Sequence, residues 1–341
     1  MIGSNPSPAY DELISYVERI NRSNGGTSCG LFVIRNDQVV AEHYRGVAGT
    51  RPTEADSQYN VASVRKSYLG WAAAWALHDG AIRSFDDPIL NYITANEEDR
   101  VALDGVTIRH LLTHTHGINL DDNGRLTRIF NPGLAWDYNN LGIDLLCDLL
   151  QQATGSSIAE MLDTRVFQPM GFTETKWHTA PTEKLVPVVG DHGSAIILDP
   201  RDDGSGGNLF VSARELAYWG YLHLKLGRVN GKSIVPESVV RTAISVQTPT
   251  SLPAMYPRNG CLWLLKKGEA AECLIGQDVP KNSYKIVGIY GPLVLVVPEL
   301  DLVVVRMANR VGNYGDAKGT YIDYLKEFSN KAVGCARRVF A

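Results

Sequence analysis

The chain has 341 residues, 44% of them hydrophobic, enough to bury a sizeable core in one large domain or two interleaved ones. Its 33 basic and 37 acidic residues nearly balance, and no block of like charge stands out, so the composition indicates neither a nucleic-acid-binding surface nor a membrane-binding patch. No apolar run approaches the length that spans a bilayer, and the first residues lack the regions of a signal peptide. We therefore expect a cytoplasmic protein that acts on a small molecule.

The five cysteines are odd in number, scattered along the chain and without C-x-x-C spacing, which argues against a disulfide framework or a zinc site. We expect free, buried thiols. They are Cys29, Cys147, Cys261, Cys273 and Cys335.

Helix and strand signals form three blocks. The first predicts an amphipathic helix and then a β-hairpin around Asn36 and Asp37. The second, residues 63–247, carries mainly helical signals, and the third predicts strands followed by a final helix. The expected helices are 10–21, 108–112, 142–152, 212–226 and 321–332, and the expected strands are 31–34, 39–41, 261–265, 284–289, 293–297 and 302–307.

This pattern predicts an α+β fold. The strands of residues 1–62 and 248–341 can meet in one antiparallel sheet flanked by the terminal helices, which makes this domain discontinuous in sequence. Residues 63–247 would form a mostly α-helical domain packed on one side of it.

The tetrad Ser63-Val64-Arg65-Lys66 leads directly into an apolar helical run. Residues three apart share a face of a helix, so Lys66 can reach the Ser63 hydroxyl. Serine is a weak nucleophile until a nearby group takes its proton, and the start of a helix favours the negative charge that then develops. The tetrad indicates a nucleophile with its activator, although a serine before a helix is more often just an N-cap.

A second cluster, Tyr138-x-Asn140, lies at a turn before the helix expected over 142–152. Its two side chains could converge on Ser63. A nearby ammonium lowers the pKa of a phenol, so Tyr138 could serve as a general base, and the amide of Asn140 could hold Lys66 and a substrate carbonyl. An isolated Tyr-x-Asn is usually a loop tyrosine and a capping asparagine, and only the pairing with Ser-x-x-Lys favours the catalytic interpretation.

Together these motifs resemble the serine β-lactamase and penicillin-binding-protein superfamily, in particular the class C-like branch that includes family VIII carboxylesterases, D-aminopeptidases and related amidases. The resemblance covers nearly the whole chain, since further segments follow the family's order and spacing. They are residues 84–88 (SFDDP), 107–117 (TIRHLLTHTHG), 169–172 (PMGF) and 298–305 (PELDLVVV). The resemblance implies an antiparallel sheet with flanking helices plus an α domain, with the active site between them.

The resemblance also implies the roles of the site residues. Ser63 would attack an acyl carbon and form a covalent acyl-enzyme, Lys66 and Tyr138 would share proton transfer, and Asn140 would position the reacting groups. Two backbone N–H groups, here those of Ser63 and Ile289, would stabilise the oxyanion. No cofactor is expected.

The third family motif departs from the family's pattern. The strand position that usually reads Lys-Thr-Gly, His-x-Gly or Trp-x-Gly is Ile286-Val287-Gly288 here, so no cation stands at the expected place. Lys285 is adjacent, but neighbouring side chains of a strand face opposite sides, so Lys285 could enter the site only through a bulge or a shifted register. Tyr290, beside the proposed oxyanion strand, is expected to line an acyl pocket.

Three histidines, His110, His114 and His116, invite a metal interpretation. Two helix-spaced ligands without an H-E-x-x-H acid are too few for a catalytic zinc site. We expect a structural role for this segment and no metal.

Two classes of function remain open. The first is a serine hydrolase, with an esterase or amidase for a small acyl substrate favoured over a β-lactamase or D-amino-acid peptidase. In penicillin-recognising relatives the cation of the third motif helps to bind the substrate carboxylate, and its loss weakens the case for those substrates. The second class is a binding or sensor protein that keeps the fold and acylates slowly or not at all.

Overall fold

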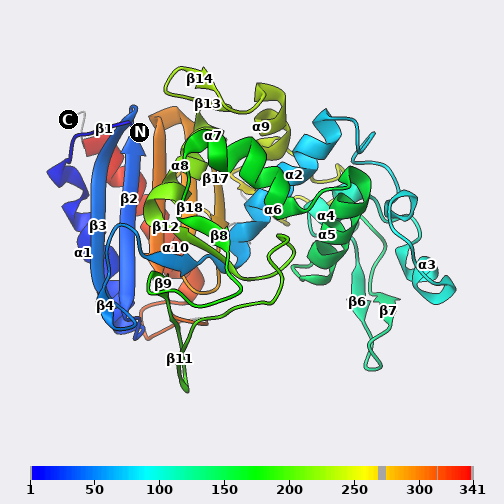
Figure 1. The fold of residues 1–341 in the computed structure, drawn as a ribbon, viewed down its shortest axis with the longest axis horizontal. Coiled ribbons are helices and arrows are strands. Elements are labelled where there is room, and N and C mark those ends of the chain that lie inside the picture. The colour runs from blue at the N-terminus through cyan, green and yellow to red at the C-terminus, as the bar shows by residue number, and fades with distance from the viewer. Residues whose placement is uncertain (1, 268–273, 313, 339–341) are drawn as a thin grey trace.

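A computed structural model describes residues 2–267, 274–312 and 314–338. One half of the molecule is built on a nine-stranded sheet (Figure 1). Its strand order is β1-β3-β2-β19-β18-β17-β16-β15, with β4 paired to β3. The strands are β1 (Gly3–Ser4), β2 (Ser28–Arg35), β3 (Gln38–Ala48), β4 (Arg51–Pro52), β15 (Arg258–Asn259), β16 (Leu264–Leu265), β17 (Tyr284–Val287), β18 (Leu293–Val297) and β19 (Leu302–Ala308).

The early and late parts of the chain meet inside this sheet. β2 pairs with β19 in an antiparallel register that runs from Arg35 opposite Leu302 to Cys29 opposite Ala308. The remaining pairs are also antiparallel, except that the short β1 runs parallel to β3. The prediction that strands from both ends form one antiparallel sheet is confirmed.

The predicted hairpin joins β2 to β3. Asn36 and Asp37 take left-handed φ angles of 47° and 61°. Two consecutive residues in this conformation match the twist of the flanking strands, and Asn and Asp tolerate it better than other non-glycine residues.

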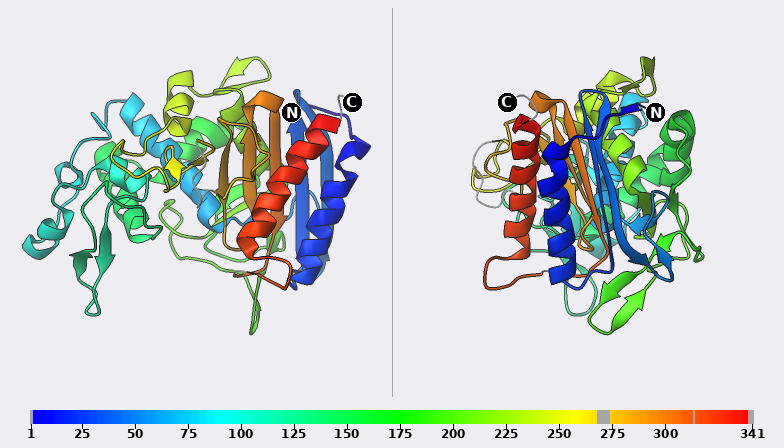
Figure 2. Two further views of the ribbon diagram at one scale, coloured as in Figure 1. Left: turned by 180° about the vertical axis from the view of Figure 1, so that it is seen from behind. Right: turned by 90° about the vertical axis from the view of Figure 1, so that its left-hand side faces the viewer.

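Helices cover both faces of the sheet. α1 (Asp11–Ser23) and α10 (Tyr321–Arg338) lie side by side on one face (Figure 2), and α8 (Ala213–Leu224) packs on the other. With both faces covered, central strands become continuously apolar, as in β18, where every residue is buried. Gly220 lets α8 approach closely, since a Cβ there would lie 2.7 Å from Val303.

The other half is mainly helical and surrounds α2 (Lys66–His78), which starts at the Ser-x-x-Lys tetrad. Nearly all of α2 is buried, and it is apolar on every side because α5, α6 and α9 pack around it. The helices of this half are α3 (Glu97–Leu103), α4 (Ile108–Leu112), α5 (Leu141–Thr154), α6 (Ile158–Leu162), α7 (Gln168–Met170) and α9 (Glu237–Ile244).

The middle segment and the residues just before it also contain strands that the sequence analysis did not predict. A four-stranded sheet has the order β8-β12-β5-β9, and three small hairpins project from the loops. Strands this short show too little alternation of apolar and polar residues to be recognised in a sequence. They are β5 (Gln58–Asn60), β8 (Thr175–Trp177), β9 (Leu185–Val186) and β12 (Leu209–Ser212), and the hairpins are β6 (Ile118–Leu120) with β7 (Leu126–Arg128), β10 (Val188–Gly190) with β11 (Gly193–Ala195), and β13 (Arg228–Val229) with β14 (Lys232–Ser233).

The proposed domain division at residues 63 and 247 remains a prediction. α8 lies within the segment assigned to the helical domain, yet it packs on the large sheet, so the two halves interlock. In the described ranges, no helix is both long and apolar enough to cross a membrane. Four cysteines are free and buried, whereas Cys273 lies outside the described residues.

Candidate active site

Ser63 lies in a short 3₁₀ turn, Ala62–Arg65, between β5 and α2. The preceding Ala62 has a φ of 47°, a left-handed conformation that a residue with a Cβ adopts at a cost of about 1–3 kcal/mol. Asn60, at the end of β5, holds this turn, because its Oδ1 accepts a hydrogen bond of 2.9 Å from the Ala62 amide. The small sheet therefore fixes the position of Ser63 in front of the large one.

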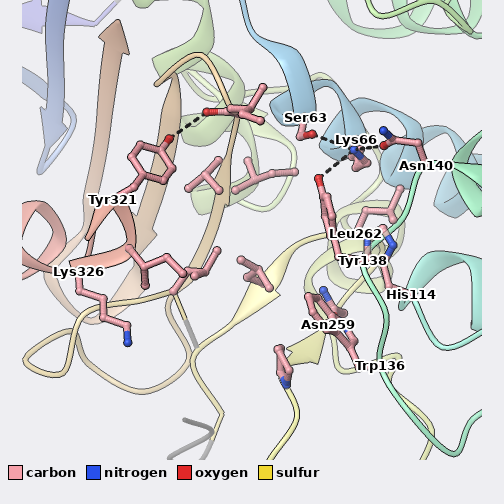
Figure 3. Close-up of a pocket in the computed structure, with 18 residues that line it drawn as sticks. Ser63, Lys66, His114, Trp136, Tyr138, Asn140, Asn259, Leu262, Tyr321 and Lys326 are labelled. Carbon is pink, nitrogen blue, oxygen red and sulfur yellow. Dashed lines mark hydrogen bonds between the residues drawn. The ribbon is translucent and has the colours of Figure 1, made fainter. Parts of the chain in front are cut away.

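Lys66, the first residue of α2, lies at the centre of the polar cluster (Figure 3). Its Nζ donates to the Oγ of Ser63 at 2.8 Å, the hydroxyl of Tyr138 at 2.9 Å and the Oδ1 of Asn140 at 2.9 Å. Three oxygens match the three N–H donors of an ammonium. The structure thus brings together the two motifs that the sequence analysis paired.

Burial sets the protonation of Lys66. The side chain is 3% exposed, and loss of solvation together with the nearby Arg65 cation lowers its pKa to about 7. Near neutral pH a large fraction of Lys66 is therefore a neutral amine with a lone pair. In that state Ser63 can turn its hydroxyl proton toward Nζ, which makes Lys66 a competent general base.

The expectation that the pKa of Tyr138 is lowered is wrong. Although the residue is 46% exposed, loss of solvation raises its pKa above the ordinary value of 10.0, while the hydrogen bond with Ser63 and the Arg65 cation act in the opposite direction. The physical reason is that loss of solvation, which disfavours the charged phenolate, outweighs the favourable contacts around the hydroxyl. Tyr138 is consequently a phenol at neutral pH, able to donate a proton rather than to serve as the resting base.

Gly288, directly after β17, brings the strand end against the nucleophile turn. A Cβ on Gly288 would lie 2.3 Å from the carbonyl oxygen of Val61 and 3.2 Å from the Cβ of Ala62. Within the described part of the chain, the backbone N–H groups of Ser63 and Ile289 donate no hydrogen bond. Two unpaired donors beside the nucleophile are suited to stabilising an oxyanion.

The cluster opens into a cavity of about 670 Å³. Tyr290, expected to line an acyl pocket, is not among the lining residues, although Ile286, Gly288 and Ile289 are. Most of the wall is apolar, and many lining residues come from segments without a recognised motif. The lining residues that the sequence analysis did not assign to the pocket include His114, Pro257, Asn259, Leu262, Leu264, Leu274, Val287, Tyr321, Ile322 and Lys326.

The family model described as Beta-lactamase matches residues 13–326. The chain belongs to the beta-lactamase family of serine hydrolases. It is 38% identical to an uncharacterised protein of Alkalihalophilus pseudofirmus over 96% of this chain and 97% of that protein. It is 26% identical to Esterase EstB of Burkholderia gladioli over 49% of this chain and 56% of that protein. A solved class C beta-lactamase in complex with cefoxitin has a TM-score of 0.75 at 15% identity, covering 96% of this chain and 98% of the other.

The third motif of this beta-lactamase-family chain presents an apolar side chain to the cavity. Ile286 lines it, whereas Lys285 points to the opposite face of β17. There the Nζ of Lys285 donates to the carbonyl oxygens of Leu274 and Leu325, each at 2.9 Å, and to the Oγ of Ser329 at 2.8 Å. The pairing of β17 with β18 is regular, so no bulge turns Lys285 into the site.

The segment that contains the three histidines packs against the catalytic cluster. The ring centroids of His114 and Tyr138 lie 4.6 Å apart. The backbone carbonyl oxygen of His114 accepts a hydrogen bond of 2.9 Å from the Asp137 amide. Burial and the neighbouring Lys66 hold the pKa of His114 well below its ordinary value, so it adds no cation to the cluster. The Nδ1 of His110 accepts from the Thr107 amide and caps α4. No group of three potential metal ligands occurs in the residues that the structure describes.

Replacing Gly288 by alanine is expected to slow the reaction of Ser63 by more than about tenfold and to lower the melting temperature, because the new Cβ would force β17 away from the nucleophile turn. The rate of labelling by a fluorophosphonate, which reacts with activated serines, measures the first effect. Gly334→Ala in α10 is the matched control, since a Cβ there meets nothing within 4 Å. Wild-type labelling by Gly288→Ala would show that the close approach is dispensable.

Proposed function

We propose that this protein is a serine esterase or amidase that cleaves a small acyl substrate through an acyl-enzyme on Ser63. The observation that carries the proposal is the cluster of Ser63, Lys66, Tyr138 and Asn140 at the end of an apolar cavity, with the pKa of Lys66 lowered to about 7. A buried amine near its pKa is suited to general base catalysis at neutral pH.

The arrangement supports the following acylation step. Neutral Lys66 takes the proton of Ser63 as its Oγ bonds to the substrate carbonyl carbon, and the N–H groups of Ser63 and Ile289 stabilise the oxyanion. The bond from carbon to the leaving oxygen or nitrogen then breaks. Tyr138 donates its phenolic proton to that leaving atom and regains one from Lys66, so protons and electrons balance. In deacylation, water takes the place of the leaving group and the acid is released.

Ile286 favours ester and amide substrates over β-lactams. A cation at this position would bind the carboxylate of a penicillin by charge-assisted hydrogen bonds, and an isoleucine cannot. The partial similarity to an esterase agrees with this choice. A β-lactamase or D-amino-acid peptidase activity is the alternative for the same acyl-enzyme. The cytoplasmic location also stays a prediction from the sequence.

Release of 4-nitrophenol from 4-nitrophenyl butyrate by wild type and Ser63→Ala, beside a chromogenic cephalosporin in the same buffer, tests the proposal. We expect wild type to cleave the ester, Ser63→Ala to lose at least about a thousandfold in rate, and the cephalosporin to persist. Strong turnover of the cephalosporin with weak ester cleavage would contradict the substrate class. No turnover together with a stable mass adduct on Ser63 would favour a sensor.

A further inference from the structure

The cavity has a second charged side chain besides Lys66. Lys326, in the second turn of α10, lines the same cavity as Ser63, and Figure 3 places the two at opposite sides of it. α10 is joined to the strand end beside the nucleophile, since the Tyr321 hydroxyl donates to the Gly288 carbonyl oxygen at 3.2 Å. The helix is therefore held against the cavity, with Lys326 on its wall.

No carboxylate forms an ion pair with Lys326 in the described part of the chain, although Asp323, one turn earlier on α10, is near enough to interact with it electrostatically. Its side chain is half-buried, and neither a hydrogen bond nor an ion pair engages its Nζ there. Both neighbouring carboxylates on α10 accept their hydrogen bonds from groups other than Lys326. Asp323 accepts from the amide and hydroxyl of Thr320 at 2.9 and 2.7 Å, and Glu327 accepts from the Tyr16 hydroxyl at 3.1 Å. A cation that lines an apolar cavity and forms no ion pair with a described carboxylate is available to an anionic ligand.

Much of the wall of this cavity is apolar. Leu264, Leu274, Ile286 and Ile322 line the cavity together with Ser63 and Lys326. Such a wall favours a hydrocarbon chain, which gains about 0.8 kcal/mol per buried methylene group. The single positive charge of Lys326 is balanced by the single negative charge of a carboxylate, whereas a phosphate dianion would leave a net negative charge beside the apolar wall.

We infer that Lys326 determines specificity by binding a carboxylate at the far end of the substrate's acyl chain. This inference rests on the proposed function and names its substrate class, esters or amides of long dicarboxylic acids. Lys326 of α10 would then supply the cation that is missing at position 286 of the third motif. The aliphatic part of the acyl chain lies along the apolar wall.

The kinetic test compares 4-nitrophenyl hydrogen suberate with 4-nitrophenyl octanoate, which have equally long acyl chains and differ by the terminal carboxylate. The ratio of their kcat/KM values, anionic over neutral, is expected to fall about tenfold in Lys326→Met and to be largely kept in Lys326→Arg. Lys331→Met is the matched control, because Lys331 on the same helix pairs with Glu12 outside the cavity. An unchanged ratio in Lys326→Met would overturn the inference.

A binding test separates this inference from the proposed function. Both esters remain intact on Ser63→Ala protein if Ser63 is the nucleophile, so their Kd values can be compared with those on Ser63→Ala/Lys326→Met. We expect the anionic ester to bind about tenfold more weakly to the double variant, with a difference that shrinks in high salt. If wild type cleaves neither these esters nor 4-nitrophenyl butyrate, the proposed function fails, and the Kd comparison still decides the role of Lys326. Equal Kd values would refute it.

Discussion

Replacing Lys66 by methionine is expected to reduce the rate of Ser63 acylation by roughly a thousandfold. Methionine keeps the length and the apolar character of the side chain but removes the nitrogen that lies 2.8 Å from the Ser63 Oγ. Within the described residues, no other titratable nitrogen donates to or accepts from that hydroxyl. Fluorophosphonate labelling and ester hydrolysis measure the loss. Near wild-type rates would remove Lys66 from the mechanism.

The same variant is expected to be more stable than wild type below pH 7. The pKa of Lys66 falls from 10.5 to about 7 on folding, so below pH 7 the folded protein carries the full cost of a buried ammonium. As the pH rises from about 7 to 10.5, the folded state has lost this proton while the unfolded state still binds one, and wild-type stability rises. The gain in Lys66→Met should therefore shrink over this interval.

Urea denaturation at pH 6 and pH 9 checks the expected stability change. A more stable but inactive Lys66→Met protein would show that its loss of activity does not come from unfolding. If the variant is instead less stable at pH 6, the hydrogen bonds of Lys66 to Tyr138 and Asn140 outweigh the cost of burying its charge.

The parts of the site that could be predicted are those set by local geometry. Ser63 and Lys66 are one helical turn apart, so their contact follows from the sequence spacing alone. The opposite directions of Lys285 and Ile286 likewise follow from the alternation of a strand. The central sheet could be predicted because its buried strands carry continuous apolar runs.

The parts that could not be predicted depend on packing between distant segments. The pKa of Tyr138 was assigned the wrong direction because a motif gives the neighbouring charge but not the loss of solvation that outweighs it. His114 and Lys326 line the cavity because α4 and α10 pack against it, and neither lies in a motif that names such a role. The strand β5, which positions Ser63, was missed because it is too short to show alternation.

Replacing Tyr138 by phenylalanine is expected to slow the cleavage of alkyl esters by roughly a hundredfold to ten-thousandfold, the usual effect of removing a general acid or base. The Tyr138 hydroxyl lies 2.9 Å from the Nζ of Lys66 and stays protonated at neutral pH, so its role is to donate a proton to the leaving group. An alkoxide needs that proton, whereas 4-nitrophenolate leaves readily without it. The loss should therefore be much smaller for a 4-nitrophenyl ester. Tyr290→Phe, outside the cavity, is the matched control.

The pH dependence of Tyr138→Phe distinguishes a proton donor from a resting base. In wild type, kcat/KM should rise as the pH increases through about 7, because Lys66 becomes active when it loses its proton. If Lys66 is the base, this rise persists in Tyr138→Phe, at a lower rate with alkyl esters. If the phenolate of Tyr138 is the base, the variant loses the rise and is impaired equally with alkyl and 4-nitrophenyl esters. The raised pKa of Tyr138 and the lowered pKa of the buried Lys66 both favour the first result.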